Sequence, residues 1–277
     1  MKEIRDYVGE NQRILDEWEK YNNQHEKNEK PNFAPDGIMY RGAWDQYPAE
    51  DGHIISERYE DENNKENELW ANAPIRYLFI TKDQNAWGGE AWDVRGETAR
   101  YEYNSESIPL RFYRNFLYLL YGLSHTSNNV MCGYNDFTNA QAIETFDSIS
   151  VARINVKKQA GTKSISNAVL ARYMDRDKDF ILRQVKNLDA DIIICCGYSD
   201  SVDKSGNLIL NFLNDNLYNF KKVIDDWIYY DEDNNKVAIN AWHLSYLGVK
   251  EKDFFEGMIS AYHEFLKMHP NFTDSHR

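Results

Sequence analysis

The sequence has few cysteines and no long apolar run. Its three cysteines, Cys132, Cys195 and Cys196, are odd in number and include an adjacent pair. Such a set makes a poor disulfide framework and is typical of a reducing compartment. No apolar run reaches the ~18 residues of a membrane-spanning helix, and the N-terminal stretch lacks the apolar core of a signal peptide. We therefore expect a soluble, cytoplasmic protein with no membrane partner.

Metal-binding spacings are also missing. Cys195 and Cys196 lie in the apolar run "DIIICCG", so we interpret them as small buried side chains and not as metal ligands. The four cysteines that usually ligate an iron–sulfur cluster are not available. We predict neither a metal nor another cofactor.

Positive charge is scarce as well. The chain has 45 Asp and Glu against 32 Lys and Arg, which gives a net charge of −13. Phosphate contacts need clustered Lys and Arg, so we do not expect a broad basic face for duplex DNA, although a local basic strip can coexist with a negative total. The hydrophobic content of 42% is ample for a buried core and excludes global disorder.

Four short runs are apolar at nearly every position: residues 75–81, 149–156, 189–197 and 236–242. This pattern is typical of strands covered by helices on both faces. Helix-length segments separate the runs, so residues 74–277 are predicted to form a three-layer α/β/α domain with a central, mostly parallel four-stranded sheet. Residues 1–73 are predicted to form a helix and long loops packed on that domain.

Polar side chains follow three of the four predicted strands. They are Lys82, Asp83 and Asn85 after the first strand, Asn155 and Lys157 after the second, and His243 and Ser245 after the fourth. In an open parallel sheet, ligands bind outside the carboxyl ends of the strands. We therefore expect these side chains to meet at one edge of the sheet.

Three of these residues have chemical interpretations and structural alternatives. Asp83 can polarise a water molecule as a general base, or it can cap a turn. Asn155 offers one acceptor and two donors for the edge of a planar amide such as a nucleobase, or it can form a turn. His243 can donate to an oxygen that gains negative charge, or it can be a structural histidine. Their coincidence at strand ends favours a site.

The order of these motifs resembles the uracil-DNA glycosylase superfamily. "TKDQNA" takes the place of the family motif GQDPYH, with Asp83 on its Asp, and "ARINVKK" matches the strand LLNAVLTV, with Asn155 on its Asn. "HLSYLG" matches HPSPLS, with His243, Ser245 and Leu247 in register. "IPLRFYRNFLYLL" resembles IPPSLKNIF, and the resemblance extends from about residue 75 to the C-terminus.

The sequence departs from the family pattern at several motif positions. Gln84 and Asn85 replace the Pro and Tyr of the first motif, and Leu244 and Tyr246 replace both prolines of the last. Proline fixes the backbone, so we expect a changed pocket wall and a changed DNA-facing loop. The chain also resembles a bacterial branch of the superfamily that has no assigned substrate.

The resemblance implies hydrolysis of a base that is single-stranded or swung out of a duplex. Asp83 would orient the attacking water or stabilise the cationic sugar, His243 would stabilise the departing base anion, and Asn155 would hold the base edge. Leu247 is the positional match for the wedge that fills the gap in the duplex.

Further contacts with substrate are expected on the resemblance. A base would stack on Trp92, Tyr101 or Tyr103, with Trp92 favoured because it lies in the loop beyond Asp83, although a core role suits it equally. A rim of loop cations could meet phosphates or could pair with nearby acids. These cations are Lys82, Arg95, Lys157, Lys158 and Lys163.

Three functions remain open at this point. The chain is predicted to hydrolyse the N-glycosidic bond of a damaged or deaminated base in DNA. It can instead be a non-catalytic protein of the same fold that binds a nucleobase, a nucleotide or a partner protein. It can also be a hydrolase of free nucleotides. The acidity favours the last two, and the coincidence of Asp83, Asn155 and His243 favours catalysis.

Overall fold

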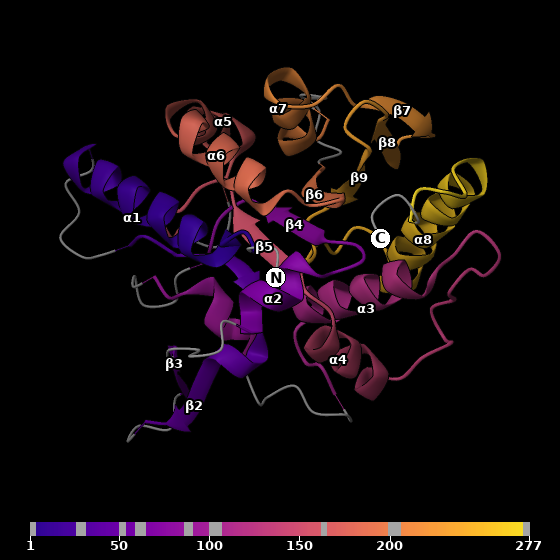
Figure 1. The fold of residues 1–277 in the computed structure, drawn as a ribbon, viewed down its shortest axis with the longest axis horizontal. Helices are drawn as coiled ribbons and strands as arrows, with labels where there is room; N and C mark the ends of the chain where they lie inside the picture. The colour runs from indigo at the N-terminus through magenta and orange to yellow at the C-terminus, as the bar shows by residue number, and fades with distance from the viewer. Residues whose placement is uncertain are drawn as a thin grey trace. The chain divides into compact units, whose positions relative to one another are not determined.

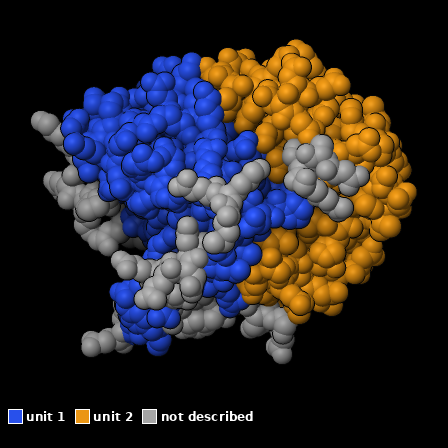
Figure 2. All heavy atoms as spheres, in the orientation of Figure 1, with its two compact units in different colours: residues 1–100, 150–190 blue, residues 101–149, 191–277 orange. Residues whose placement is uncertain are grey.

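The computed structural model describes residues 4–25, 32–49, 54–58, 65–85, 91–99, 107–161, 165–198 and 206–273. The chain is α/β (Figure 1) and divides into two compact units. Unit 1 consists of residues 1–100 and 150–190, and unit 2 of residues 101–149 and 191–277 (Figure 2). The predicted boundary between residues 73 and 74 therefore lies inside unit 1.

Unit 1 combines a small sheet with helices and a separate hairpin. Its helices are α1 (Tyr7–His25), α2 (Lys65–Ala71), α5 (Asn167–Arg176) and α6 (Lys178–Leu188). Its strands are β1 (Gly37–Met39), β4 (Tyr77–Thr81) and β5 (Val151–Asn155), with β2 (Trp44–Pro48) and β3 (Ile54–Arg58) in the hairpin. A short 3-10 helix at Arg41–Ala43 follows β1, and another lies at Val94–Ala99.

The sheet of unit 1 has the order β1-β5-β4. Strands β4 and β5 pair in parallel and are buried at all five positions, and the burial in β5 includes the polar residues Arg153 and Asn155. Strand β1 adds to β5 in antiparallel register. The predicted N-terminal helix is present as α1, which buries Ile14, Leu15 and Trp18 and packs against α6. Trp18 stacks on Phe180 of α6, with ring centroids 5.6 Å apart.

Unit 2 holds the other two predicted strands. Its helices are α3 (Arg111–His125), α4 (Asn139–Ser148), α7 (Leu208–Asn216) and α8 (Glu251–Met268). Its strands are β6 (Ile192–Tyr198), β7 (Lys221–Ile224), β8 (Ile228–Asp231) and β9 (Lys236–Trp242), in the order β6-β9-β8-β7. Strands β6 and β9 are parallel, and β8 and β7 continue the sheet in antiparallel register.

The prediction of four strands is too low, because β1, β7 and β8 also join these sheets. The helix-length segment before the last apolar run holds more than a helix, because α7 ends at Asn216 and β7 and β8 form a hairpin after it. The turn needs a left-handed residue, Asp225 at φ 40°, and Asn235 at φ 51° serves the next turn. Strand β7 is half exposed and carries two lysines, so its sequence lacks the apolar run of a buried strand.

The structure bears on the prediction for the two adjacent cysteines and on the search for membrane-spanning helices. Cys195 and Cys196 are both fully buried in β6, which confirms their interpretation as packing residues. In the part of the chain that the structure describes, every helix is too short or too polar to cross a lipid bilayer.

Candidate functional site

The ends of β4 and β5 form a continuous platform in unit 1. Thr81 pairs with Asn155 in the parallel register, and the pairing continues beyond the strands. The Lys157 backbone N–H donates to the Lys82 carbonyl at 3.0 Å, and the Gly161 N–H donates to the Gln84 carbonyl at 2.7 Å. The loops that carry the predicted residues are therefore fixed by backbone hydrogen bonds.

Asp83 and Asn155 lie on the same face of this platform. Side chains alternate along extended chain, so Thr81 and Asp83 share a face, as do Asn155 and Lys157. Two contacts across the ladder establish that these faces coincide. Thr81 Oγ1 lies 2.5 Å from Asn155 Oδ1, and Lys157 Nζ lies 3.3 Å from Asp83 Oδ2. Within unit 1, the structure thus brings together three of the predicted residues.

The Asp83 carboxyl group has an electrostatically unusual environment. Its side chain is only 12% exposed, and burial raises its pKa above the ordinary value. Lys157 opposes this shift by its charge and hydrogen bond, and Lys82 opposes it more weakly. A buried carboxylate with a raised pKa, flanked by cations at a strand end, is typical of a general base.

The two lysines beside Asp83 are themselves buried to different degrees. Lys157 is 7% exposed, donates to the Gln159 carbonyl as well as to Asp83, and lies 5.0 Å from the centroid of the Tyr173 ring. Burial lowers the pKa of the half-buried Lys82, and the charge of Asp83 opposes that shift. These contacts make Lys157 an internal partner of Asp83.

Only the oxygen of the Asn155 side-chain amide forms a hydrogen bond among the described residues. Its Oδ1 accepts the bond from Thr81, whereas Nδ2 is buried and has no hydrogen-bond partner among the described residues. The Asn155 backbone is firmly held, because its N–H donates to Asp36 Oδ2 at 2.7 Å and its carbonyl accepts from Lys158 Nζ at 2.8 Å. The site therefore contains a well-positioned amide with unused donors.

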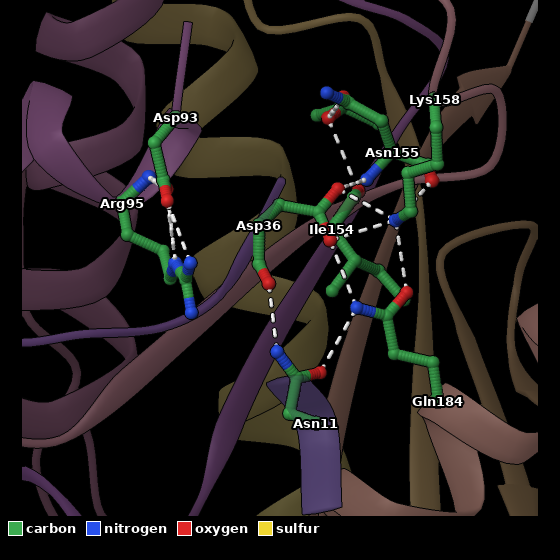
Figure 3. A network of polar contacts seen from close by, with 9 residues as sticks. Asn11, Asp36, Asp93, Arg95, Ile154, Asn155, Lys158 and Gln184 are labelled. Carbon is green, nitrogen blue, oxygen red and sulfur yellow. Dashed lines mark hydrogen bonds and ion pairs between the residues drawn. The ribbon is translucent and has the colours of Figure 1, made fainter. Parts of the chain in front are cut away.

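A network of buried polar side chains binds the backbone of Asn155 (Figure 3). Lys158 and Asp36 are both completely buried, and Lys158 Nζ lies 2.7 Å from each Asp36 carboxylate oxygen. Lys158 also donates to Gln184 Oε1, and the Gln184 amide donates to Asn11 and Asp36. The prediction that Lys158 belongs to a cationic rim is wrong, since its charge lies in the core of unit 1.

Arg95 likewise is not a rim cation. It is 4% exposed, and its guanidinium group binds the Asp93 carboxylate at 2.6–3.2 Å and Gln12 Oε1 at 3.1 Å. The burial and the carboxylate partner leave its charge compensated inside the protein. Lys163, Tyr101 and Tyr103 lie outside the described residues.

Gln84 has a structural role that the motif comparison did not reveal. Its side chain donates to the Trp92 carbonyl at 2.8 Å and accepts from the Trp92 N–H at 3.1 Å. These two hydrogen bonds fix Gln84 to the backbone of Trp92. Trp92 is half buried, and Asn85 is exposed and forms a bridge with Gly161.

Gly161 leaves the space that the Asp83 carboxylate occupies. A Cβ atom at position 161 would lie 2.4 Å from Asp83 Oδ2 and 3.3 Å from Lys157 Nζ. The alanine variant Gly161→Ala is therefore expected to displace the carboxylate and to cost about 1–3 kcal/mol of folding free energy, as overpacking usually does. Urea unfolding measures this loss, and unchanged stability would show that the pair tolerates the methyl group.

His243 belongs to unit 2 and is held by Ser245. Its Nδ1 lies 2.8 Å from Ser245 Oγ and accepts from the Ser245 backbone N–H at 3.3 Å. A backbone N–H can only donate, so Nδ1 is the acceptor and the neutral imidazole carries its proton on Nε2. The ring lies 5.7 Å from that of Phe112. These contacts with Ser245 fix the orientation of the His243 ring.

The loop after His243 presents two exposed large hydrophobic side chains, Tyr246 and Leu247. Leu247 is 80% exposed, whereas Leu244 is completely buried and its carbonyl accepts from Asn115 Nδ2 at 2.6 Å. Tyr246 stacks on Trp242 with ring centroids 6.1 Å apart, and Arg111 donates to the Val249 carbonyl. These contacts hold the loop on both sides of Leu247.

Comparisons of the chain with protein-family models, curated proteins and solved structures found no match.

Unit 2 also contains a cavity of about 480 Å³. It is lined by Tyr230, Glu232, Asn235, Met268, His269, Pro270, Asn271 and Phe272. The predicted site residues are not among them. No group of three or more Asp, Glu, His or Cys side chains in the described part of the chain is arranged to hold a metal ion.

Proposed function

We propose that the chain hydrolyses the N-glycosidic bond of a nucleobase at the strand-end site of Asp83 and Asn155. The observation that carries this proposal is the combination of two groups on one face of the β4–β5 ladder. One is a buried carboxyl group whose pKa is raised by burial, and the other is a buried amide whose Nδ2 has no partner among the described residues. Such a pair supplies a base for water and a hydrogen-bond donor for a flat heterocycle.

The proposed reaction uses water as the nucleophile. Asp83 accepts a proton from the water molecule while its oxygen forms a bond to C1′ of the sugar. The bond from C1′ to the base nitrogen breaks, and the base leaves with the electron pair. Under this proposal the chain has a divergent, three-layer α/β/α form of the uracil-DNA glycosylase fold.

Free nucleosides and nucleotides are the favoured substrates. Three of the five cations predicted to meet phosphates are instead buried beside carboxylates: Arg95, Lys157 and Lys158. A substrate with few phosphate groups needs less of a basic surface, and the net charge of −13 is compatible with such a substrate. DNA is the second candidate. Leu247, the proposed wedge that fills the gap left by a flipped base, is exposed, and contacts of its neighbouring residues hold its loop.

Base release from a set of substrates tests the proposal. The purified protein would be incubated with uridine, inosine and their 5′-monophosphates in ribose and deoxyribose forms, and with single-stranded and duplex oligonucleotides that contain uracil or hypoxanthine. Chromatography detects the free base, and strand cleavage detects abasic sites. Release from the small substrates alone supports the first candidate, and release from oligonucleotides supports the second. Failure to release any base, with the wild type and Asp83→Asn behaving alike, would end the proposal.

The pH dependence of turnover reports on Asp83. The carboxylate must be ionised to accept a proton, so activity is lost as the pH falls through its folded-state pKa. Burial raises that pKa, so the acidic limb of kcat/KM should have its midpoint above pH 3.8, the ordinary value. Lys157→Met removes the cation that most lowers the pKa and should move the midpoint to higher pH.

Lys82→Met is the matched control for this measurement. Lys82 acts on Asp83 by charge alone and more weakly than Lys157, so its removal should move the midpoint upward by a smaller amount. A downward shift in Lys157→Met, or equal shifts in both variants, would contradict the assignment of Lys157 as the main partner of Asp83.

A further inference from the structure

The cavity of unit 2 lies between the β8–β9 turn and the end of α8. Its lining comes from two segments, within residues 230–235 and 268–272, and its volume of about 480 Å³ is in the range of small-molecule sites. The residues to which the proposed hydrolysis is assigned are not part of this lining. The cavity is therefore a separate candidate site.

Three aromatic rings form walls of this cavity. The Tyr230 ring lies 4.8 Å from the His269 ring and 6.2 Å from the Phe272 ring, and its plane stands at 81° to that of Phe272. The Tyr230 hydroxyl donates to Asn235 Oδ1 at 2.9 Å. Phe265 is completely buried behind the rings and lies 4.6–5.3 Å from all three of them. These contacts hold the rings in place before any ligand arrives.

The charge of the lining is negative. Glu232 contributes a carboxylate, and the lining formed by the described residues has no Lys or Arg. The nearest lysines along the chain, Lys236 and Lys267, each form an ion pair with an acidic side chain. Lys221, the cross-strand partner of Tyr230, is exposed and does not line the cavity. Burial raises the pKa of the Tyr230 phenol, and the negative charge of Glu232 raises it further, so this carboxylate acts on the aromatic wall.

We propose that this cavity binds the ammonium head group of a small organic cation. A cation is attracted to the negative face of an aromatic ring, and walls built from several rings are a common receptor for methylated ammonium groups. Glu232 adds an opposite charge beside the rings. An anion would be repelled by this carboxylate, and a neutral ligand would gain nothing from it.

Choline and 3,3-dimethylbutan-1-ol test the proposal, because the two molecules have the same shape and only choline is charged. The protein would be labelled with ¹³C at its methionine methyl groups and titrated at about pH 8, where histidine side chains are ordinarily neutral. Met268 lines the cavity, whereas Met174 is buried in unit 1 and gives the reference signal. We expect choline to shift the Met268 signal and to bind about five- to thirtyfold more tightly than the alcohol.

Two variants assign the binding to the carboxylate and to the ring. Glu232→Gln removes the charge of an exposed side chain and should weaken choline binding about two- to fivefold, with no change for the alcohol. Tyr230→Leu removes one wall and should lower the preference for choline. Glu256→Gln is the matched control, since this 44% exposed side chain lies about 18 Å along α8 from Met268 and should bind choline as the wild type does.

Equal affinities for choline and the alcohol would overturn the proposal, as would a Met268 signal that neither compound shifts. A preference for choline that neither Glu232→Gln nor Tyr230→Leu lowers would also overturn it. If Tyr230→Leu does not fold, Glu232→Gln decides alone, because its side chain is exposed. None of these outcomes depends on whether the chain releases a base.

Discussion

Asp83→Asn is expected to lower kcat by about 10²–10⁴-fold, the usual contribution of a general base. The amide has nearly the same shape as the carboxylate but cannot take a proton from water. Asp83 is positioned for this role by its pairing with Lys157 at 3.3 Å and by the backbone bonds between the two loops. Binding of the free base should change little, because base recognition is assigned to Asn155.

Steady-state kinetics and base titrations on the same preparations check this expectation. Asp175→Asn is the matched control, since it makes the same change of charge at an exposed position of α5 in the same unit. Its kcat should stay close to that of the wild type. An equal loss in both variants would assign the effect to net charge, and an active Asp83→Asn enzyme would remove Asp83 from the reaction.

Lys158→Met is expected to lower the free energy of unfolding by about 3–5 kcal/mol, the cost of leaving a buried charge without its partner. Asp36 and Lys158 are both completely buried, and Lys158 Nζ contacts both carboxylate oxygens. Methionine fills much of the volume of lysine but leaves the Asp36 carboxylate uncompensated. The loss should extend to the site, because Asp36 and Lys158 also bind the backbone of Asn155.

Urea unfolding of single and double variants measures this effect. The double variant Asp36→Asn with Lys158→Met removes both charges and keeps an acceptor for the Asn155 N–H, so it should lose less stability than the sum of the two single variants. Lys186→Met, at an exposed position of α6, should change stability by no more than about 0.5 kcal/mol. Additive losses in the double variant would show that the pair is not energetically coupled.

The buried strands were predictable because burial on both faces leaves a local signature. Strands β4, β5, β6 and β9 are apolar at nearly every position, and each is found where the sequence predicts a strand. Strand β7 carries Lys221 and Lys222 on exposed positions, so its residues resemble the end of the preceding helix. Strand β1 has only three residues within a segment rich in proline and glycine, too few for a periodic pattern.

The candidate site was only partly predictable. Parallel strands in register bring the residues that follow them together, so the proximity of Asp83 and Asn155 could be expected from the sequence. The burial of Lys158 could not be expected from the sequence, because its carboxylate partner Asp36 is 122 positions away along the chain. The hydrogen bond at Asn155 Oδ1 could not be predicted either, because its donor is the Thr81 hydroxyl group on the neighbouring strand.

The sequence by itself determined the α/β class, the four buried strands and the polar residues at their ends, because these follow from the periodicity of neighbouring side chains. Only the tertiary structure decided which charges are buried in pairs, which end of an amide is used, and which apolar side chain is exposed. These properties arise from contacts between segments far apart in the chain. A local pattern of residues does not indicate which distant segment a side chain will contact.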